Sequence, residues 1–145
     1  MNIYIIKTEP KAYSIDDLSR DKKTKWDGVH NYQAINYIKQ WEIGDLVLIY
    51  HSTGESRIVG LGEVISLPEK DLEDPKGISY FSYIQFIRKF RDDETISLKE
   101  IKATNLFSDF SLVKQSRLSV ILCNQAFIRW LHSKGINLDL YRQDL

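Results

Sequence analysis

The sequence predicts an α+β fold in which helices surround a small, mixed, barrel-like β-sheet. Short runs rich in β-branched and aromatic residues outnumber the long helical patterns. The helical patterns fall between these runs at irregular intervals, which argues against a doubly wound sheet. The 145 residues are 43% hydrophobic and 28% charged, as is typical of a soluble domain that buries its own core. We therefore expect residues 1–145 to form a single domain.

The first half of the chain predicts two strands and two helices. Residues 2–6 form an apolar, β-branched run that is typical of a strand. Ser14 and Asp17 have the spacing of a capping box and predict the start of a helix. Apolar residues at helical spacing predict a second helix over 34–41. Residues 46–50 are apolar at every position, as expected for a strand that is buried on both faces.

Two long strands follow. Residues 58–67 predict the first of them, and Gly60 and Gly62 interrupt its pattern. Such glycines indicate a bulge, a barrel corner or a close approach of another segment. Residues 68–79 contain prolines and a glycine and predict the longest loop. Residues 80–90 predict a long aromatic strand.

The last third of the chain predicts two helices and one strand. Ser97 begins a second capping-box pattern and predicts a short helix. Residues 103–117 resemble a loop, and residues 117–122 predict a final strand. Asn124 is expected to cap the last helix, and Gly135 to end it.

Charge and cysteine content exclude several classes of protein. Twenty basic and twenty acidic side chains cancel, whereas proteins that grip duplex DNA mainly through phosphates usually carry a basic excess. Nucleic acid would therefore need a local pocket and a local basic patch. The longest basic stretch, residues 20–25, is expected to be a solvated helix end and loop. The single cysteine, Cys123, lies in an apolar run and is expected to be buried rather than nucleophilic.

No segment has the roughly 18 apolar residues of a membrane span, and acidic Glu9 lies where a signal peptide would be apolar. We expect a cytoplasmic protein, or a nuclear one in a eukaryote.

Aromatic rings, amides, hydroxyls and charges are distributed over three clusters of residues: 7–10, 26–34 and 50–52. A core needs only the rings, whereas a site that stacks a flat ligand and reads its edge needs both rings and polar groups. Trp26, Tyr32 and Tyr50 are the candidate stacking residues, with plain core packing as the alternative that we favour for Tyr50. These clusters predict a reader of a nucleobase-like group.

Polar candidates accompany the rings. Asn31 and Gln33 can read a base edge, although Asn31 is equally well placed to cap a helix. Thr8 and Glu9 follow a strand, and a carboxylate accepts a hydrogen bond from the amino group of cytosine; Glu9 serves equally well as a surface residue. Lys7 is a candidate phosphate contact or ion-pair partner.

Arg117 is a second cation that either reaches phosphate or pairs with an acid. The adjacent His51 and Ser52 are ligand-binding candidates. They are a poor catalytic pair because neighbouring strand residues point to opposite faces. The three histidines lack metal-ligand spacing, so we expect no metal and no cofactor.

Together these motifs resemble the EVE domain family of the PUA-like superfamily, of the thymocyte nuclear protein type. The family's motifs stand in order along this chain as Lys7-Thr8-Glu9-Pro10, Trp26 to Ala34, Gly44-Asp45 followed by Tyr50-His51-Ser52, and Arg117-Leu118-Ser119-Val120. Two departures concern charge, since His30 and Ile35 occupy positions where the family has arginine.

The resemblance implies a PUA-like β-barrel with flanking helices and an aromatic-lined pocket for a base swung out of nucleic acid, modified cytosines included. Val29 and Ser119 lie in the matched motifs and join the candidate ligand-binding residues on that basis.

The leading hypothesis is a non-catalytic module that recognises a flipped or single-stranded, modified base in DNA or RNA, and that is a monomer by default. One alternative is an enzyme acting on a modified base or nucleotide, with Glu9 or His51 as general acid or base. Another is a small-molecule or protein-interaction module that has lost nucleic acid binding.

Overall fold

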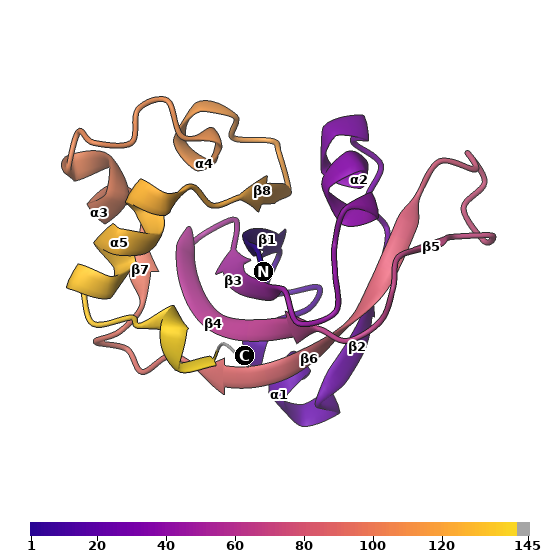
Figure 1. Cartoon of the computed structure of the whole chain (residues 1–145), viewed down its shortest axis with the longest axis horizontal. Coiled ribbons are helices and arrows are strands. Elements are labelled where there is room, and N and C mark those ends of the chain that lie inside the picture. Colours follow the sequence, from indigo (N-terminus) through magenta and orange to yellow (C-terminus); the bar gives the residue numbers. More distant parts are fainter. Residues whose placement is uncertain (142–145) are drawn as a thin grey trace.

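A curved, mixed β-sheet runs through the protein, and helices pack around it (Figure 1). The computed structural model describes residues 1–141. The main strands are hydrogen-bonded in the order β2-β6-β4-β3-β1-β8, while β5 pairs with β6 and β7 pairs with β4. The bounds are β1 (Ile3–Thr8), β2 (Lys23–Trp26), β3 (Leu46–His51), β4 (Arg57–Val64), β5 (Glu69–Lys70), β6 (Tyr80–Lys89), β7 (Ile96–Ser97) and β8 (Val120–Leu122).

The sheet curls like a barrel without closing completely. Strands β1 and β3 run parallel, and every other pairing within residues 1–141 is antiparallel. In the same part of the chain no pairing joins the edge strands β2 and β8. The predicted α+β, barrel-like fold is confirmed.

Side chains cap the helices at the predicted places. Ser14 forms a capping box with Asp17, and the side chains of Ser97 and Asn124 each accept from a backbone amide of the helix that follows. Gly135 follows the last helix with a φ of +95°, as a C′ glycine does. The bounds are α1 (Ile15–Asp21), α2 (Tyr32–Lys39), α3 (Leu98–Ala103), α4 (Ser111–Lys114), α5 (Gln125–Ser133) and the 3₁₀ helix η1 (Leu138–Tyr141).

Within residues 1–141, no helix has the length and apolar character needed to cross a membrane.

The core lies on β1, β3 and β4 and under the helices. Every residue of β3 is buried, as its uniformly apolar sequence predicts. Trp41 follows α2 and is buried against the ring of Tyr4, at a centroid distance of 6.0 Å. Cys123 is buried, and burial raises the pKa of its thiol, so its predicted role as a small core residue is confirmed.

Gly60 and Gly62 permit close approach on both sides of β4. A Cβ atom at Gly60 would lie 2.4 Å from Cδ1 of Ile15, so glycine lets α1 pack against the sheet. A Cβ atom at Gly62 would lie 2.9 Å from Cγ2 of Ile84. The register with β6 shifts between Leu61 and Gly62. Both the predicted bulge and the predicted close approach are present.

One prediction is wrong in a way that affects the site. The basic stretch 20–25 begins at the end of α1, as predicted, but from Lys23 it forms β2, which pairs with β6, rather than a loop. In β2, outward Lys23 and Lys25 alternate with inward Thr24 and Trp26, a period-2 pattern typical of a half-buried strand. The consecutive charged residues made this short alternation hard to recognise in the sequence.

Smaller differences lie at element ends. The last strand begins at Val120 rather than at 117, and β4 ends at Val64 rather than at 67. One helical turn, α4, forms inside the predicted loop 103–117. None of these differences moves the core.

Candidate functional site

A pocket of about 350 Å³ lies beside the carboxyl end of β1 and the end of β2. Its volume is in the range of about 300–1,000 Å³ that is usual for small-molecule sites. Four segments that are distant in sequence form its wall: the end of β1, the turn before α1, β2 with the following loop, and the residue before β8. The lining residues are Lys7, Thr8, Tyr13, Thr24, Lys25, Trp26, Asp27, Gly28, Val29, His30 and Ser119.

Two aromatic rings form one side of the wall. Trp26 is 8% exposed, and its ring meets that of Tyr13 edge to face at a centroid distance of 6.5 Å and an interplanar angle of 82°. The Tyr13 hydroxyl donates to Asp21 at 2.9 Å, which fixes the ring. The pair offers a rigid apolar surface to a flat ligand.

Lys7 and Thr8 supply polar groups at the end of β1. The Nζ atom of Lys7 donates to the Ser116 carbonyl at 2.9 Å and lies 5.5 Å from the centre of the Tyr50 ring. Burial lowers the pKa of the Lys7 ammonium. The hydroxyl of Thr8 donates to the Tyr13 carbonyl at 2.6 Å, so its oxygen remains able to accept from a ligand.

The loop after β2 is held from behind by the segment before β6. Gly28 has a φ of +75°, which turns the chain at the pocket. The carbonyl of Val29 accepts from the Ser79 hydroxyl at 2.6 Å. His30 places Nε2 3.3 Å from Oδ1 of Asp74. This double attachment gives the pocket loop a fixed shape.

Asp74 is a permanent anion behind the pocket loop. Burial acts to raise the pKa of its carboxyl, but hydrogen bonds from the backbone amides of Ser79, Ile78 and Lys76 outweigh burial and hold the pKa well below its usual range. The side chain is 1% exposed. Asp74 therefore orders the loop and faces His30 with a full negative charge.

The structure gathers part of the predicted set at this pocket: Lys7, Thr8, Trp26, Val29 and Ser119 line it. The remaining candidates lie outside the wall, and each has another position. Glu9 and Arg117 are exposed. The Glu9 carbonyl accepts from the backbone amides of Ala12 and Tyr13, which shapes the turn before α1.

The start of α2 lies beyond the pocket wall. Asn31 caps this helix, since its Oδ1 accepts from the Ala34 amide at 3.0 Å. Tyr32 is 69% exposed and Gln33 is exposed. The carbonyl oxygen that made Asn31 a candidate reader is thus engaged by the helix.

The third predicted cluster serves the scaffold. Tyr50 is buried, in line with the preference for core packing. Nε2 of His51 accepts from the Ile15 amide at 3.0 Å, which joins β3 to the start of α1. The backbone amide of Ser52 donates to the Thr8 carbonyl at 3.0 Å. His51 and Ser52 thus stabilise the strand ends that carry the pocket.

Several pocket residues were absent from the predicted set: Tyr13, Thr24, Lys25, Asp27, Gly28 and His30. Asp27 is the carboxylate that lines the pocket, the role that the sequence suggested for Glu9. Asp27, Gly28 and His30 stand inside the Trp26 motif, so the motif itself was the available signal. Thr24 and Lys25 required recognition of β2.

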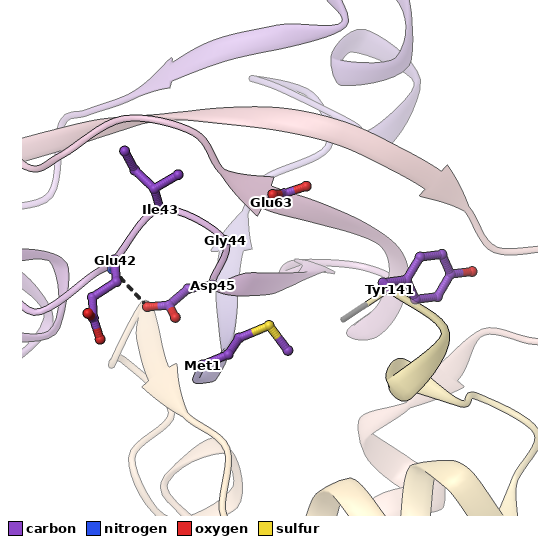
Figure 2. Close-up of a pocket in the computed structure, with 7 residues that line it drawn as sticks. All are labelled: Met1, Glu42, Ile43, Gly44, Asp45, Glu63 and Tyr141. Carbon is purple, nitrogen blue, oxygen red and sulfur yellow. Dashed lines mark hydrogen bonds between the residues drawn. The ribbon is translucent and has the colours of Figure 1, made fainter. Parts of the chain in front are cut away.

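A second pocket, of about 200 Å³, lies at the amino ends of β1 and β3 (Figure 2). Its carboxylates include Glu42, Asp45 and Glu63, and no lysine or arginine lines it. Asp45 accepts from the backbone amides of Asn2 and Glu42, each at 2.9 Å, so it is a structural group. An acidic pocket of this kind repels a phosphate-bearing ligand.

A wider pocket, of about 620 Å³, lies between α1 and the β4–β6 end of the sheet. Its charges are mixed, and Lys89 pairs with Asp16 at 2.8 Å. Within residues 1–141 no group of three histidine, cysteine or acidic side chains is placed to hold a metal ion. Of these three pockets, the one beside Trp26 joins a tryptophan ring and a tyrosine ring to two lysines.

The open, barrel-like α+β sheet with a pocket at its strand ends defines a PUA-like domain. The model of the EVE domain matches residues 2–134, and the chain belongs to this family.

Among curated proteins, thymocyte nuclear protein 1 of Gallus gallus is 28% identical over an aligned length of 151 residues. The alignment covers 81% of this chain and 62% of the relative. The chain thus spans less than two thirds of that relative's length. Among solved structures, a hypothetical protein from Leishmania major has a TM-score of 0.81 and 30% identity, covering 94% of this chain and 98% of the other. Human THYN1 protein in complex with 5-methylcytosine-containing DNA has a TM-score of 0.81 and 25% identity, covering 94% of this chain and 99% of the other.

Proposed function

We propose that this protein is a non-catalytic DNA-binding module that accepts a modified cytosine in the pocket beside Trp26. The observation that carries the proposal is the pocket itself, which combines the Trp26–Tyr13 wall with Lys7, Lys25 and an open carboxylate. The family relationship supports it, because the human relative was solved with 5-methylcytosine-containing DNA. Since the chain matches only part of its curated relatives, the module's activity, and not theirs, is proposed.

A base inside a duplex cannot reach such a pocket, so the base is swung out of the helix. Its ring packs against Trp26 and Tyr13, and base–aromatic stacking contributes about 1–3 kcal/mol per base. The exocyclic amino group of cytosine donates to Asp27 or Thr8, since both present acceptor oxygens. Val29 offers the apolar contact that a methyl group on C5 requires.

Lys7 and Lys25 supply the positive charge at the pocket. Lys7 is half-buried, and this burial lowers the pKa of its ammonium. A phosphate beside it therefore adds attraction at little further desolvation cost. These local cations allow DNA binding by a chain whose net charge is zero.

The non-catalytic assignment is supported by the positions of Glu9 and His51, the two acid–base candidates that the sequence offered. Neither Glu9 nor His51 lines the pocket, and Nε2 of His51 is engaged by the Ile15 amide. A general base must lie within hydrogen-bond reach of the proton it removes. The proposed place of action is the cytoplasm, or the nucleus in a eukaryote.

The test is an anisotropy titration with DNA oligonucleotides that differ by one methyl group on one cytosine, with RNA oligonucleotides of the same sequence alongside. The methylated DNA is expected to bind more tightly, and Val29→Ala to narrow that difference. Leu106→Ala is the control, because Leu106 is an exposed apolar residue in the loop after α3. Equal affinity for both DNA molecules, or tighter binding of unmodified RNA, would overturn the proposal.

A further inference from the structure

The outer face of β2 and β6 carries two rings and a cation, Lys23, that do not line the pocket. Tyr83 lies opposite Lys25 in the β2–β6 ladder, and Gln85 lies opposite Lys23. Directly paired residues share a face of the sheet, and residues two apart along a strand do so too. Phe81 therefore belongs to the same face, and we name Lys23, Lys25, Phe81 and Tyr83 the outer-face patch.

Two residues of this patch are exposed and the other two, Lys25 and Phe81, are half-buried, whereas the opposite face is closed. Tyr83 is 39% exposed and Lys23 is exposed. On the other face of β6, Ser82 and Ile84 are fully buried. The aromatic rings are thus not part of the core, and packing does not account for them.

Lys25 connects the patch to the pocket. It lines the pocket wall, while its Nζ atom lies over the Phe81 ring, 4.3 Å from the centroid. The rings of Phe81 and Tyr83 then meet edge to face at 6.0 Å. A continuous path therefore runs from the pocket over Lys25 to two aromatic rings. Figure 1 shows β5, β6 and β2 side by side at one margin of the molecule.

We propose that the outer-face patch binds unpaired nucleotides next to the base held in the pocket, with one neighbouring base stacked on Tyr83 and backbone phosphates near Lys23 and Lys25. This inference rests on the proposed function and extends it to the strand beyond the base. Exposed rings on a β-sheet flanked by cations are the means by which proteins bind single strands, because every base offers a π-face. Glu69 pairs with Phe81 at the far edge and limits the positive path on that side.

The occupant is a nucleic acid strand rather than an apolar partner for two reasons. The patch is continuous with a pocket that carries two lysines, and its own charged members, Lys23 and Lys25, are cations. Lysine is instead depleted at the interfaces between proteins.

The test compares single-stranded DNA of nine nucleotides carrying a central 5-methylcytosine with the mononucleotide 5-methyldeoxycytidine monophosphate. Tyr83→Leu keeps an apolar side chain but removes the ring, and it is expected to weaken oligonucleotide binding about 10-fold while mononucleotide affinity is unchanged. Tyr83→Phe keeps the ring and is expected to bind like the wild type. Tyr32→Leu is the matched control, since Tyr32 is an exposed tyrosine outside the patch.

Charge gives a second, independent readout. Lys23→Met is expected to reduce the slope of log affinity against log salt by about 0.7, as loss of one single-strand phosphate contact does. Unchanged oligonucleotide binding by Tyr83→Leu, or an equal loss in Tyr32→Leu, would overturn the inference and leave the pocket proposal intact. Failure of the wild type to bind either ligand would overturn both.

Discussion

The two ends of the parallel strands β1 and β3 carry pockets of opposite character. At the carboxyl end, Lys7 and Thr8 join Trp26 in a pocket with cations, rings and a hydroxyl oxygen that can still accept. At the amino end, Asp45 and Glu63 line an acidic pocket, and both oxygens of Asp45 are engaged by backbone amides (Figure 2). The same pair of strands thus supports a candidate binding pocket at one end and a structural joint at the other.

This difference indicates that a pocket binds a ligand through hydrogen-bonding groups that the protein itself does not already use, and that a cavity alone is not enough. A carboxylate whose oxygens already bond buried amides stabilises the fold. Asp27, by contrast, is an exposed carboxylate at the rim of its pocket. Substitutions at the two ends should therefore separate stability from binding.

The largest effect is expected at Trp26. Trp26→Ala removes a nearly buried ring, so it should lower the free energy of unfolding by about 3 kcal/mol and reduce affinity for methylated DNA at least 100-fold, on the order of loss of a stacking surface worth about 3 kcal/mol. Trp26→Phe retains a ring and should recover part of both. Urea denaturation and anisotropy measure the two quantities. If the folded Trp26→Ala protein bound methylated DNA with wild-type affinity, the Trp26 ring would be a core residue that takes no part in binding.

A smaller effect distinguishes two carboxylates, Asp27 in the pocket wall and Glu9 outside it. Asp27→Asn replaces a charged acceptor at the pocket and should weaken binding of methylated DNA about 10-fold, because one good base-edge contact contributes about 1–3 kcal/mol. Glu9→Gln, the matched control outside the pocket wall, should change affinity less than about twofold. Isothermal titration calorimetry measures both variants. The reverse ranking would restore Glu9 as the reader.

At the acidic end the expectation is inverted. Asp45→Ala leaves the backbone amides of Asn2 and Glu42, which are in partly buried hydrogen bonds, without their acceptor. The free energy of unfolding should fall by about 2–4 kcal/mol, since each unsatisfied group costs about 1–3 kcal/mol. DNA affinity of the folded fraction should be unchanged. The comparison fails if this variant loses DNA binding while keeping its stability.

The last effect depends on pH and concerns Asp74 behind the pocket loop. Because hydrogen bonds hold the pKa of its folded-state carboxyl below the unfolded value of 3.8, its contribution to stability is complete above about pH 5 and is lost progressively as the pH falls through 3.8 toward the folded pKa. Thermal unfolding between pH 2 and 6 should therefore show a steeper acid loss in the wild type than in Asp74→Asn. Parallel curves for the two proteins would contradict this role.

Local signals made much of the fold predictable. Ser14 and Asn124 cap helices from fixed positions relative to an amphipathic run, and the uniformly apolar residues 46–50 indicate a strand covered on both faces. Such features depend on residues close together in sequence. Strand β2 was missed because its stability comes from pairing with β6, about sixty residues downstream in the ladder that joins Trp26 to Ser82.

The site was only partly predictable for the same reason. The motif around Trp26 indicated a pocket, but sequence offers two roles for Asn31 and for Tyr50 and cannot choose between them. The structure decides by geometry, because the Asn31 oxygen bonds the Ala34 amide and Tyr50 is covered by its neighbours. Tyr13 and Ser119 reach the pocket only because the sheet brings β1, β2 and β8 to one end.

The central claim, that a modified cytosine binds beside Trp26, is most directly tested by nuclear magnetic resonance of the three tryptophan indole N–H groups during titration with 5-methylcytosine-containing DNA. Trp41 and Trp130 lie outside the pocket wall and serve as internal references. The account predicts that the Trp26 signal shifts with the methylated DNA while the other two stay in place. A Trp26 signal that does not move at saturating DNA would contradict it.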